Sequence, residues 1–236
     1  MITAKNLSKR YGRHEVLHGL SFQAHAGQVT LLIGANGVGK TTTLRILSGL
    51  LTPDDGDALI GNRSIVRERT AAQETLSYLP QGVSFHPRLT CAAVLRFYAD
   101  LRGADPAQVG ALLDRVGLAA HAAKRTGELS GGLRQRLGLA VLLLPDAPVL
   151  LLDEPGLSLD PDWRAHLQGI LQREAARGKA VLVATHLLAE WEGVAHRALL
   201  CQRGGTVAEI DPQRLRDEFA GSTDAANETV RLPITS

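Results

Sequence analysis

A glycine-rich loop is the first part of the chain with residue types suited to binding phosphate. It reads Gly34-Ala-Asn-Gly-Val-Gly-Lys-Thr41, after the apolar run Val29 to Ile33 and before the apolar-periodic segment Leu44 to Leu50. Glycines let backbone N–H groups turn inward around phosphate oxygens, and a helix beginning after the loop adds the positive end of its dipole. A glycine-rich turn that binds nothing is the alternative, and the flanking strand and helix disfavour it. The predicted contacts are Gly34, Asn36, Gly37, Gly39, Lys40 on the terminal phosphates, Thr41 on Mg²⁺, and Thr42.

Two carboxylates follow a second apolar run. The segment Val149-Leu-Leu-Leu-Asp153-Glu154 puts both acids at the carboxyl end of a buried strand, the edge where open α/β sheets bind ligands. Asp153 is placed to hold Mg²⁺, directly or through water, and Glu154 to accept a proton from, or to orient, a water that attacks a phosphate. Taken alone, the pair could be a solvated acidic turn, but a phosphate loop in the same chain disfavours that alternative.

A third segment, Leu129-Ser-Gly-Gly-Leu-Arg-Gln-Arg136, precedes the apolar helix predicted over Leu137 to Leu144. Ser130 is a good helix N-cap, and Gly131 and Gly132 leave the helix start open to an anion. From these residues alone, a capped helix without a ligand explains the pattern equally well.

The strands that must position these residues are predicted from apolar patterning. Alternating apolar residues from Leu20 to Ala26 indicate a half-buried antiparallel strand, whereas the unbroken run Val29 to Ile33 indicates a central one. Similar runs at Leu76 to Leu79, Val149 to Leu152 and Val181 to Ala184 are separated by helical stretches. This alternation predicts an α/β fold with a mostly parallel sheet covered by helices.

Helical spacing over Thr90 to Leu101 and Pro106 to Val116 predicts a lobe of about residues 84–135, inserted between strands. We expect one domain over residues 1–220, with a last helix from Gln213 to Phe219. The polar tail, residues 221–236, is expected to be loosely held.

Composition narrows the class of protein. The 236 residues include 26 basic and 24 acidic side chains, so no global field favours nucleic acid as a partner. Two cysteines without CxxC spacing fit a reducing compartment. The chain contains neither an apolar stretch of roughly 20 residues, the length that spans a bilayer, nor a secretory signal. The expected location is therefore cytoplasmic.

The motif LSGG at Leu129 to Gly132, after a phosphate loop and before a strand ending in Asp-Glu, resembles the signature of ABC ATPases. The resemblance covers about Met1 to Pro212. It implies a P-loop NTPase (RecA-like) core with a mostly parallel sheet, an N-terminal antiparallel β subdomain and an inserted helical subdomain. It also implies an ATPase that uses ATP and Mg²⁺.

The same resemblance assigns roles to residues that would otherwise be unremarkable. Tyr11 matches the aromatic that stacks on adenine, Gln81 the glutamine that contacts Mg²⁺ and water and links the core to the lobe, and His186 the histidine on the γ-phosphate. With Glu154, Gln81 and His186 form the catalytic set. Ser130 and Asp160 are expected at a dimer interface, Ser130 on the partner's ATP.

Two positions depart from the family pattern. Leu133 stands where many members have glutamine, and Gly156 where threonine is usual after Asp-Glu-Pro. The first is expected to spare binding, because Ser130 and the Gly131 and Gly132 amides remain. The second is expected to loosen the interface loop.

The resemblance further implies partners. A single cassette needs a second ATP-binding subunit, identical or different, and an integral membrane permease, which places the chain on the inner face of the cell membrane. The stretch LPQGVSFHPRLTCAAVLRFYADLRG is similar to ATPases of export-type permeases. The alternative is a soluble ABC ATPase that acts as an assembly factor, of the iron-sulfur scaffold type. A nucleic-acid-linked ABC protein is disfavoured because it usually carries two cassettes or long coiled-coil inserts.

Overall fold

A computed structural model describes residues 1–187, 190–202 and 207–213 of the chain. Its strands form two sheets. A four-stranded antiparallel sheet has the order β2-β1-β4-β5, and a six-stranded sheet has the order β10-β9-β3-β8-β7-β6. The first sheet contains β1 (Ile2–Tyr11), β2 (His14–Ala24), β4 (Asp55–Ile60) and β5 (Arg63–Ser64). The second contains β3 (Val29–Ile33), β6 (Leu76–Leu79), β7 (Val149–Asp153), β8 (Ala180–Thr185), β9 (Arg197–Cys201) and β10 (Val207–Ile210).

Strand β3 lies in the middle of the six-stranded sheet, with β8 and β9 parallel to it on either side. Strands β7 and β6 continue the parallel arrangement, and β10 runs antiparallel to β9 at the edge. Parallel strands of one sheet end at a common edge, so the loops after β3, β6, β7 and β8 meet there. These loops carry the predicted phosphate loop and the three predicted catalytic residues, Gln81, Glu154 and His186.

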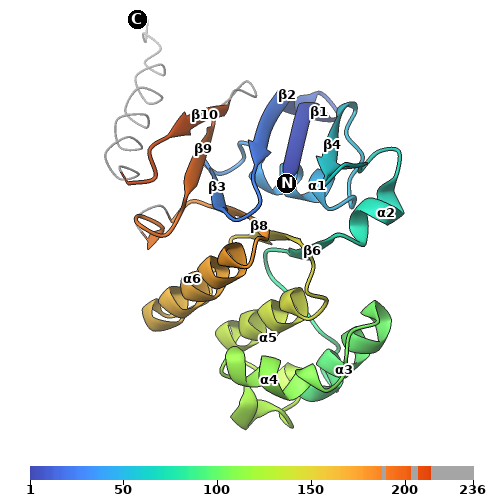
Figure 1. The fold of residues 1–236 in the computed structure, drawn as a ribbon, viewed down its shortest axis with the longest axis vertical. Coiled ribbons are helices and arrows are strands. Elements are labelled where there is room, and N and C mark those ends of the chain that lie inside the picture. Colours follow the sequence, from blue (N-terminus) through green and yellow to red (C-terminus); the bar gives the residue numbers. More distant parts are fainter. Residues whose placement is uncertain (188–189, 203–206, 214–236) are drawn as a thin grey trace, which may run out of the picture.

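The helices fall into two groups (Figure 1). Helices α3, α4 and α5 gather at one end of the molecule, away from the antiparallel sheet, and they contact one another. Helix α1 lies with the sheets, while α6 runs beside the central sheet and near α5. Their bounds are α1 (Lys40–Leu47), α2 (Arg69–Gln73), α3 (Cys91–Arg102), α4 (Gln108–Arg115), α5 (Gly131–Leu143) and α6 (Pro161–Ala176), with 3₁₀ turns η1 (Ala119–His121) and η2 (Thr126–Glu128).

The central sheet is buried on both faces. On β3, Leu31 and Ile33 pack into the core shared with α5, α6 and the helical lobe, whereas Leu32 packs into the core beneath α1 and the antiparallel sheet. Successive strand side chains point to opposite faces, which is why this strand reads as an unbroken apolar run.

The predicted fold class is confirmed. The antiparallel strand predicted from Leu20 belongs to β2, which begins earlier, at His14, and the central strand predicted from Val29 is β3. The helices predicted from Thr90 and Pro106 are α3 and α4, and the lobe boundary predicted at residue 135 falls within α5. The predicted helix from Gln213 to Phe219 and the tail lie outside the described residues, except for Gln213 itself.

Candidate nucleotide site

The phosphate loop joins β3 to α1 and takes a shape that only glycine adopts easily. Gly34, Gly37 and Gly39 have φ angles of 149°, 81° and 104°. At Gly39 a Cβ atom would come within 2.6 Å of Leu17 Cδ2, so the loop also lies too close to β2 for a side chain. Lys40, the first residue of α1, donates from Nζ to the carbonyl oxygens of Gly34 at 2.8 Å and Ala35 at 3.2 Å. The ammonium group is therefore held over the loop.

Thr41 and Asp153 meet across the gap between α1 and β7. The Thr41 hydroxyl donates to Oδ1 of Asp153 at 3.2 Å, while Oδ2 of Asp153 is buried without a hydrogen-bond partner in the described part of the chain. Burial raises the pKa of Asp153; the hydrogen bond from Thr41 acts against that rise and the neighbouring Glu154 charge adds to it. A hydroxyl and a carboxylate with an unused oxygen are hard ligands of the kind Mg²⁺ takes, so this pair fits the metal that accompanies ATP.

Glu154 and His186 directly follow the neighbouring strands β7 and β8, and their side chains are in contact. His186 Nδ1 lies 2.9 Å from Oε1 of Glu154, and the other carboxylate oxygen, Oε2, is buried with no partner in the described residues. Glu154 has a φ angle of 47°, a left-handed conformation that is energetically unfavourable for any residue other than glycine. Its backbone N–H donates to the Ala184 carbonyl oxygen at 2.9 Å. A buried carboxylate with a free oxygen can accept a proton from a water in the pocket.

Lys40, Thr41, Glu154 and His186 line one open pocket of about 710 Å³, whereas Gly34 and Asp153 are not part of its wall. Gln81, an exposed residue in the loop after β6, lies on its wall with Glu154 and His186. The remaining lining residues are His14, Val16, Asn36, Gly37, Gly39, Thr42 and Leu157. The pocket thus brings most of the predicted phosphate-binding residues together with the three predicted catalytic residues, and Asp153 reaches it through its hydrogen bond from Thr41.

Three of the lining residues, His14, Val16 and Leu157, were not predicted from the sequence. His14 and Val16 stand on β2, which the β1–β2 turn folds back over the phosphate loop. Tyr11, the predicted adenine platform, pairs with His14 at the end of this hairpin and is 48% exposed, but it is not part of the pocket wall. Its stacking role remains a prediction.

The signature residues lie outside this pocket, at the start of α5. Ser130 is exposed and caps the helix, accepting a hydrogen bond from the Leu133 N–H at 3.3 Å. A Cβ at Gly132 would come within 2.9 Å of the Ser158 carbonyl oxygen, so the signature lies directly against the loop that precedes α6. Asp160 ends that loop and caps α6, accepting from the Trp163 N–H at 2.9 Å. Ser130 and Asp160 therefore share one surface, apart from Lys40.

Neither Leu133 nor Gly156, the two departures from the family pattern, is in a strained or crowded position. Leu133 is half-buried and packs against the core on the α5 side of the sheet. Gly156 has a φ angle outside the left-handed region, and a Cβ there would make only ordinary contacts, 3.6 Å to Arg164 Cδ. Glycine is therefore not required at position 156.

Both cysteines, Cys91 and Cys201, are free and buried. Burial raises the pKa of the Cys201 thiol to about 12, which keeps it protonated and unreactive behind the phosphate loop. Across residues 1–187, 190–202 and 207–213, no helix has the length and apolar character needed to cross a membrane.

Comparison with known proteins identifies the class. The family model described as "ABC transporter" matches residues 17–156. A model described as "AAA domain, putative AbiEii toxin, Type IV TA system" matches residues 124–190. The Nod factor export ATP-binding protein I of Burkholderia orbicola is 35% identical to this chain, covering 97% of the chain and 84% of the relative. An uncharacterized ABC transporter ATP-binding protein of Bacillus subtilis is 35% identical, covering 93% of the chain and 75% of the relative.

Solved structures agree. An ATP-binding subunit of an ABC transporter superposes with a TM-score of 0.84 at 25% identity, covering 98% of this chain and all of that one. A bacterial Atm1-family ABC exporter with ATP bound superposes with a TM-score of 0.83 at 25% identity, and the match covers 98% of this chain but 42% of the exporter chain. Fold and site define a P-loop ATPase. The chain belongs to the ABC transporter family, as one of its ATP-binding subunits.

Proposed function

We propose that this chain is the motor of an export-type ABC transporter, in which two ATP-binding subunits close on ATP and drive a separate integral membrane permease. The observation that carries the proposal is the pocket in which Glu154 and His186 stand beside Lys40 and Thr41. Phosphate binding and a proton acceptor in one pocket are what ATP hydrolysis requires.

The predicted site residues have separate proposed parts in hydrolysis. Lys40 and the amides of the phosphate loop hold the β and γ phosphates. Thr41, Asp153 and Gln81 hold Mg²⁺, which when bound neutralises developing charge on the phosphate oxygens. Glu154 accepts the proton of the attacking water, and His186, which is more exposed than Glu154, contacts the γ-phosphate.

The placement of the signature residues supports a dimer. Ser130 and Asp160 share a surface outside the pocket of their own chain. The N-terminus of α5 is suited to binding an anion but lies outside the pocket of its own chain, so it is available to the ATP bound by a second subunit. In this arrangement each ATP is held between Lys40 of one subunit and Ser130 of the other.

An apolar groove supports a permease partner. It has a volume of about 350 Å³ and runs between the helical lobe and the sheet, with Leu50, Tyr98 and Leu101 among its lining residues. Leu50 and Leu101 are 67% and 64% exposed, and Phe97 on α3 is 57% exposed. Large apolar side chains concentrated on one exposed face mark an interaction surface. A permease segment seated there would place the chain on the cytoplasmic face of the cell membrane.

The relatives support export. Their names include a Nod factor export protein and, in Escherichia coli, a probable multidrug ABC transporter protein that is 36% identical over 94% of this chain and 39% of its own length. The proposed cargo class is therefore a compound carried outward by the permease.

The test is to isolate the tagged chain from detergent-extracted membranes of its own organism and identify what accompanies it. We expect the parent chain to co-purify with a multi-span membrane protein. The Phe97→Asp and Leu101→Asp variants should no longer bind that protein, whereas Arg63→Asp, a control at an exposed position on the antiparallel sheet, should still bind it. Recovery with scaffold proteins only, and no membrane protein, would instead support the assembly-factor alternative.

A further inference from the structure

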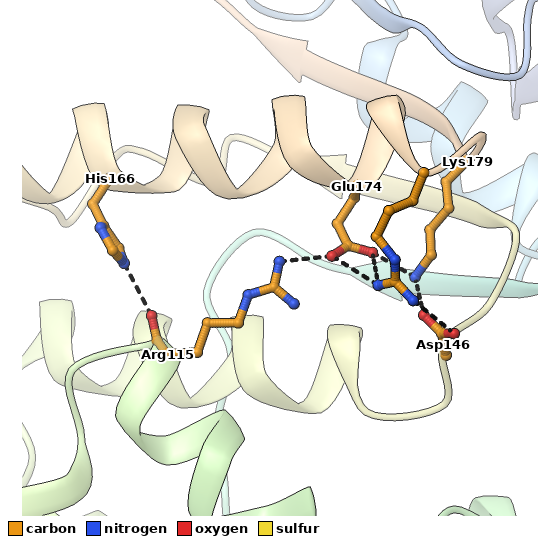
Figure 2. Close-up of polar contacts among 6 residues, drawn as sticks. Arg115, Asp146, His166, Glu174 and Lys179 are labelled. Carbon is orange, nitrogen blue, oxygen red and sulfur yellow. Dashed lines mark hydrogen bonds and ion pairs between the residues drawn. The ribbon is translucent and has the colours of Figure 1, made fainter.

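A buried carboxylate ties the helical lobe to the catalytic core (Figure 2). Glu174 lies on α6 in the core, and its side chain is 1% exposed. Its Oε1 atom accepts from Nη2 of Arg115 at 2.6 Å, and its Oε2 atom pairs with Nζ of Lys179 at 2.6 Å. Arg115 is the last residue of α4, whereas Lys179 precedes β8, so the carboxylate joins the lobe to the core.

The network extends to the segment in which the chain returns from α5 to the sheet. Lys179 Nζ also lies 2.5 Å from Oδ1 of Asp146, between α5 and β7, and Arg177 bonds to both Glu174 and Asp146. Burial by itself raises the pKa of Glu174, but hydrogen bonds from Lys179 and Arg115 outweigh it and hold that pKa below its usual value. Glu174 therefore stays charged and requires cations around it.

Arg115 is the lobe's contribution to this network, and its backbone makes a second contact with α6. The Arg115 carbonyl oxygen lies 2.9 Å from Nε2 of His166, as Figure 2 also shows. Two residues later, a Cβ at Gly117 would come within 2.4 Å of the Trp163 ring. The end of α4 is thus held against α6 by a charge pair, a backbone contact and close packing.

The same tryptophan leads on to the signature helix. The Arg136 guanidinium of α5 stands over the Trp163 ring at 3.6 Å from its centroid, and Arg136 also lies 3.5 Å from Oδ2 of Asp160. Contacts of this kind are attractive and directional. A contiguous series of contacts therefore runs from Glu174 through Arg115, His166 and Trp163 to the first turns of α5, which Ser130 caps.

We propose that Arg115 is a positioning residue: its bond to Glu174 fixes the end of α4 on α6 and thereby sets where Ser130 stands relative to Lys40 of the same chain. This inference rests on the proposed ATP-driven dimer. In that dimer Lys40 and Ser130 of one chain must reach two different ATP molecules at once, so their relative placement decides whether both sites close.

The first test measures lobe orientation in the monomer without nucleotide. Spin labels are attached at Gln108→Cys, which starts α4, and Ala176→Cys, which ends α6; both positions are exposed and the native cysteines are buried. In the parent protein, the distances between the two labels, measured by pulsed electron–electron double resonance, should form one narrow distribution. Arg115→Met should broaden it, because Glu174 retains Lys179 and Arg177 while the lobe loses its charge pair. Arg115→Lys should restore it.

A matched control is Arg96→Met, at an arginine of the lobe that is more exposed than Arg115 and makes no hydrogen bond or ion pair in the described part of the chain. Its distribution should equal that of the parent. His166→Ala removes the contact to the Arg115 carbonyl and the edge contact with the Trp163 ring but leaves the Arg115–Glu174 pair in place, and it serves as a milder variant where Arg115→Met does not fold; it should broaden the distribution less.

The second test places the same substitutions in Glu154→Gln and measures dimer formation with Mg-ATP. Arg115→Met should weaken the dimer about tenfold, a modest loss on the affinity scale, with unchanged ATP affinity of the monomer. An unaltered distance distribution in Arg115→Met, or an unaltered dimer, overturns the inference. If Glu154→Gln itself forms no dimer, the proposed function fails, and the distance measurement still decides whether Arg115 fixes the lobe.

Discussion

His186 Nδ1 lies 2.9 Å from Oε1 of Glu154, although 32 positions separate the two residues in the chain. They are brought together because β7 and β8 are parallel neighbours, with Asp153 paired to Ala184 at the carboxyl ends. Glu154 is buried, while the His186 side chain is 38% exposed. Both residues line the nucleotide pocket, His186 as the more exposed of the two, and the contact between them holds the Glu154 carboxylate in place at the pocket wall.

Lys40→Ala should reduce hydrolysis to background and weaken ATP binding at least about tenfold, since it removes a charge-assisted contact to phosphate. Steady-state ATPase assays and nucleotide titrations measure the two effects. Lys5→Ala, at an exposed lysine far from the loop in sequence, should change neither. Unchanged turnover in Lys40→Ala would show that the ammonium group does not act on the phosphates.

Tyr11→Ala should weaken nucleotide binding by about 1 kcal/mol, the value of a lost aromatic stack, whereas Tyr11→Phe should be nearly neutral. Titration with a fluorescent ATP analogue compares the three proteins. Tyr11 is exposed and stands at the end of the β1–β2 hairpin, beside the pocket residue His14. Equal affinities in all three proteins would mean that the ring does not reach the base.

Asp153→Asn should stabilise the nucleotide-free protein at pH 7 while abolishing hydrolysis. Burial raises the pKa of Asp153 in the folded state. Between the unfolded-state and folded-state pKa values, the folded protein therefore keeps a proton on Asp153 that the unfolded chain has released. The free energy of unfolding thus falls as pH rises through this range. The penalty grows as pH rises toward the folded-state pKa, and it disappears below the ordinary carboxyl range.

Thermal unfolding of both proteins from pH 3 to pH 7, without nucleotide or magnesium, checks this sign. The melting temperature of Asp153→Asn should exceed that of the parent protein at pH 7, and the difference should shrink toward pH 3. A variant that is less stable at pH 7 would mean that Lys40 and Arg45 compensate the charge more than burial penalises it.

Gly156→Ala should raise the free energy of unfolding by about 0.5 kcal/mol, because it restricts the unfolded chain without straining the folded one. The position has ordinary φ and room for a Cβ atom. Gly39→Ala is the contrasting variant, expected to be destabilising because of its φ of 104° and the contact with Leu17. Urea unfolding measures both, and a destabilised Gly156→Ala would contradict the account of the departure at that position.

The central strands could be predicted from sequence because burial on both faces gives them unbroken apolar runs, as in Val29 to Ile33 and Val149 to Leu152. Strand β1 could not, since register shifts between Ala4, Leu7 and Lys9 break its alternation. Lys40, Asp153 and Glu154 were predictable because a local motif carries them. His14 and Val16 were not, because only the fold of the hairpin over the loop brings them to the pocket.

The ion pair between Arg115 and Glu174 could not be predicted from the sequence for a similar reason. The two residues are 59 positions apart and lie in different parts of the fold. An arginine at a helix end and a glutamate within another helix read as ordinary surface charges. Only the packing of α4 against α6 buries the carboxylate and makes its partners specific.

The measurement that tests the account most directly is the ATPase rate and the oligomeric state of Glu154→Gln. The substitution keeps the side chain's shape and removes its charge and its ability to accept a proton, so hydrolysis should fall about 10²- to 10⁴-fold while ATP still binds. Size-exclusion chromatography with Mg-ATP should then show a dimer that is absent without ATP and absent in the double variant that adds Ser130→Arg. Hydrolysis by Glu154→Gln at the parent rate would contradict the assignment of Glu154 as the base, and with it the mechanism proposed for this site.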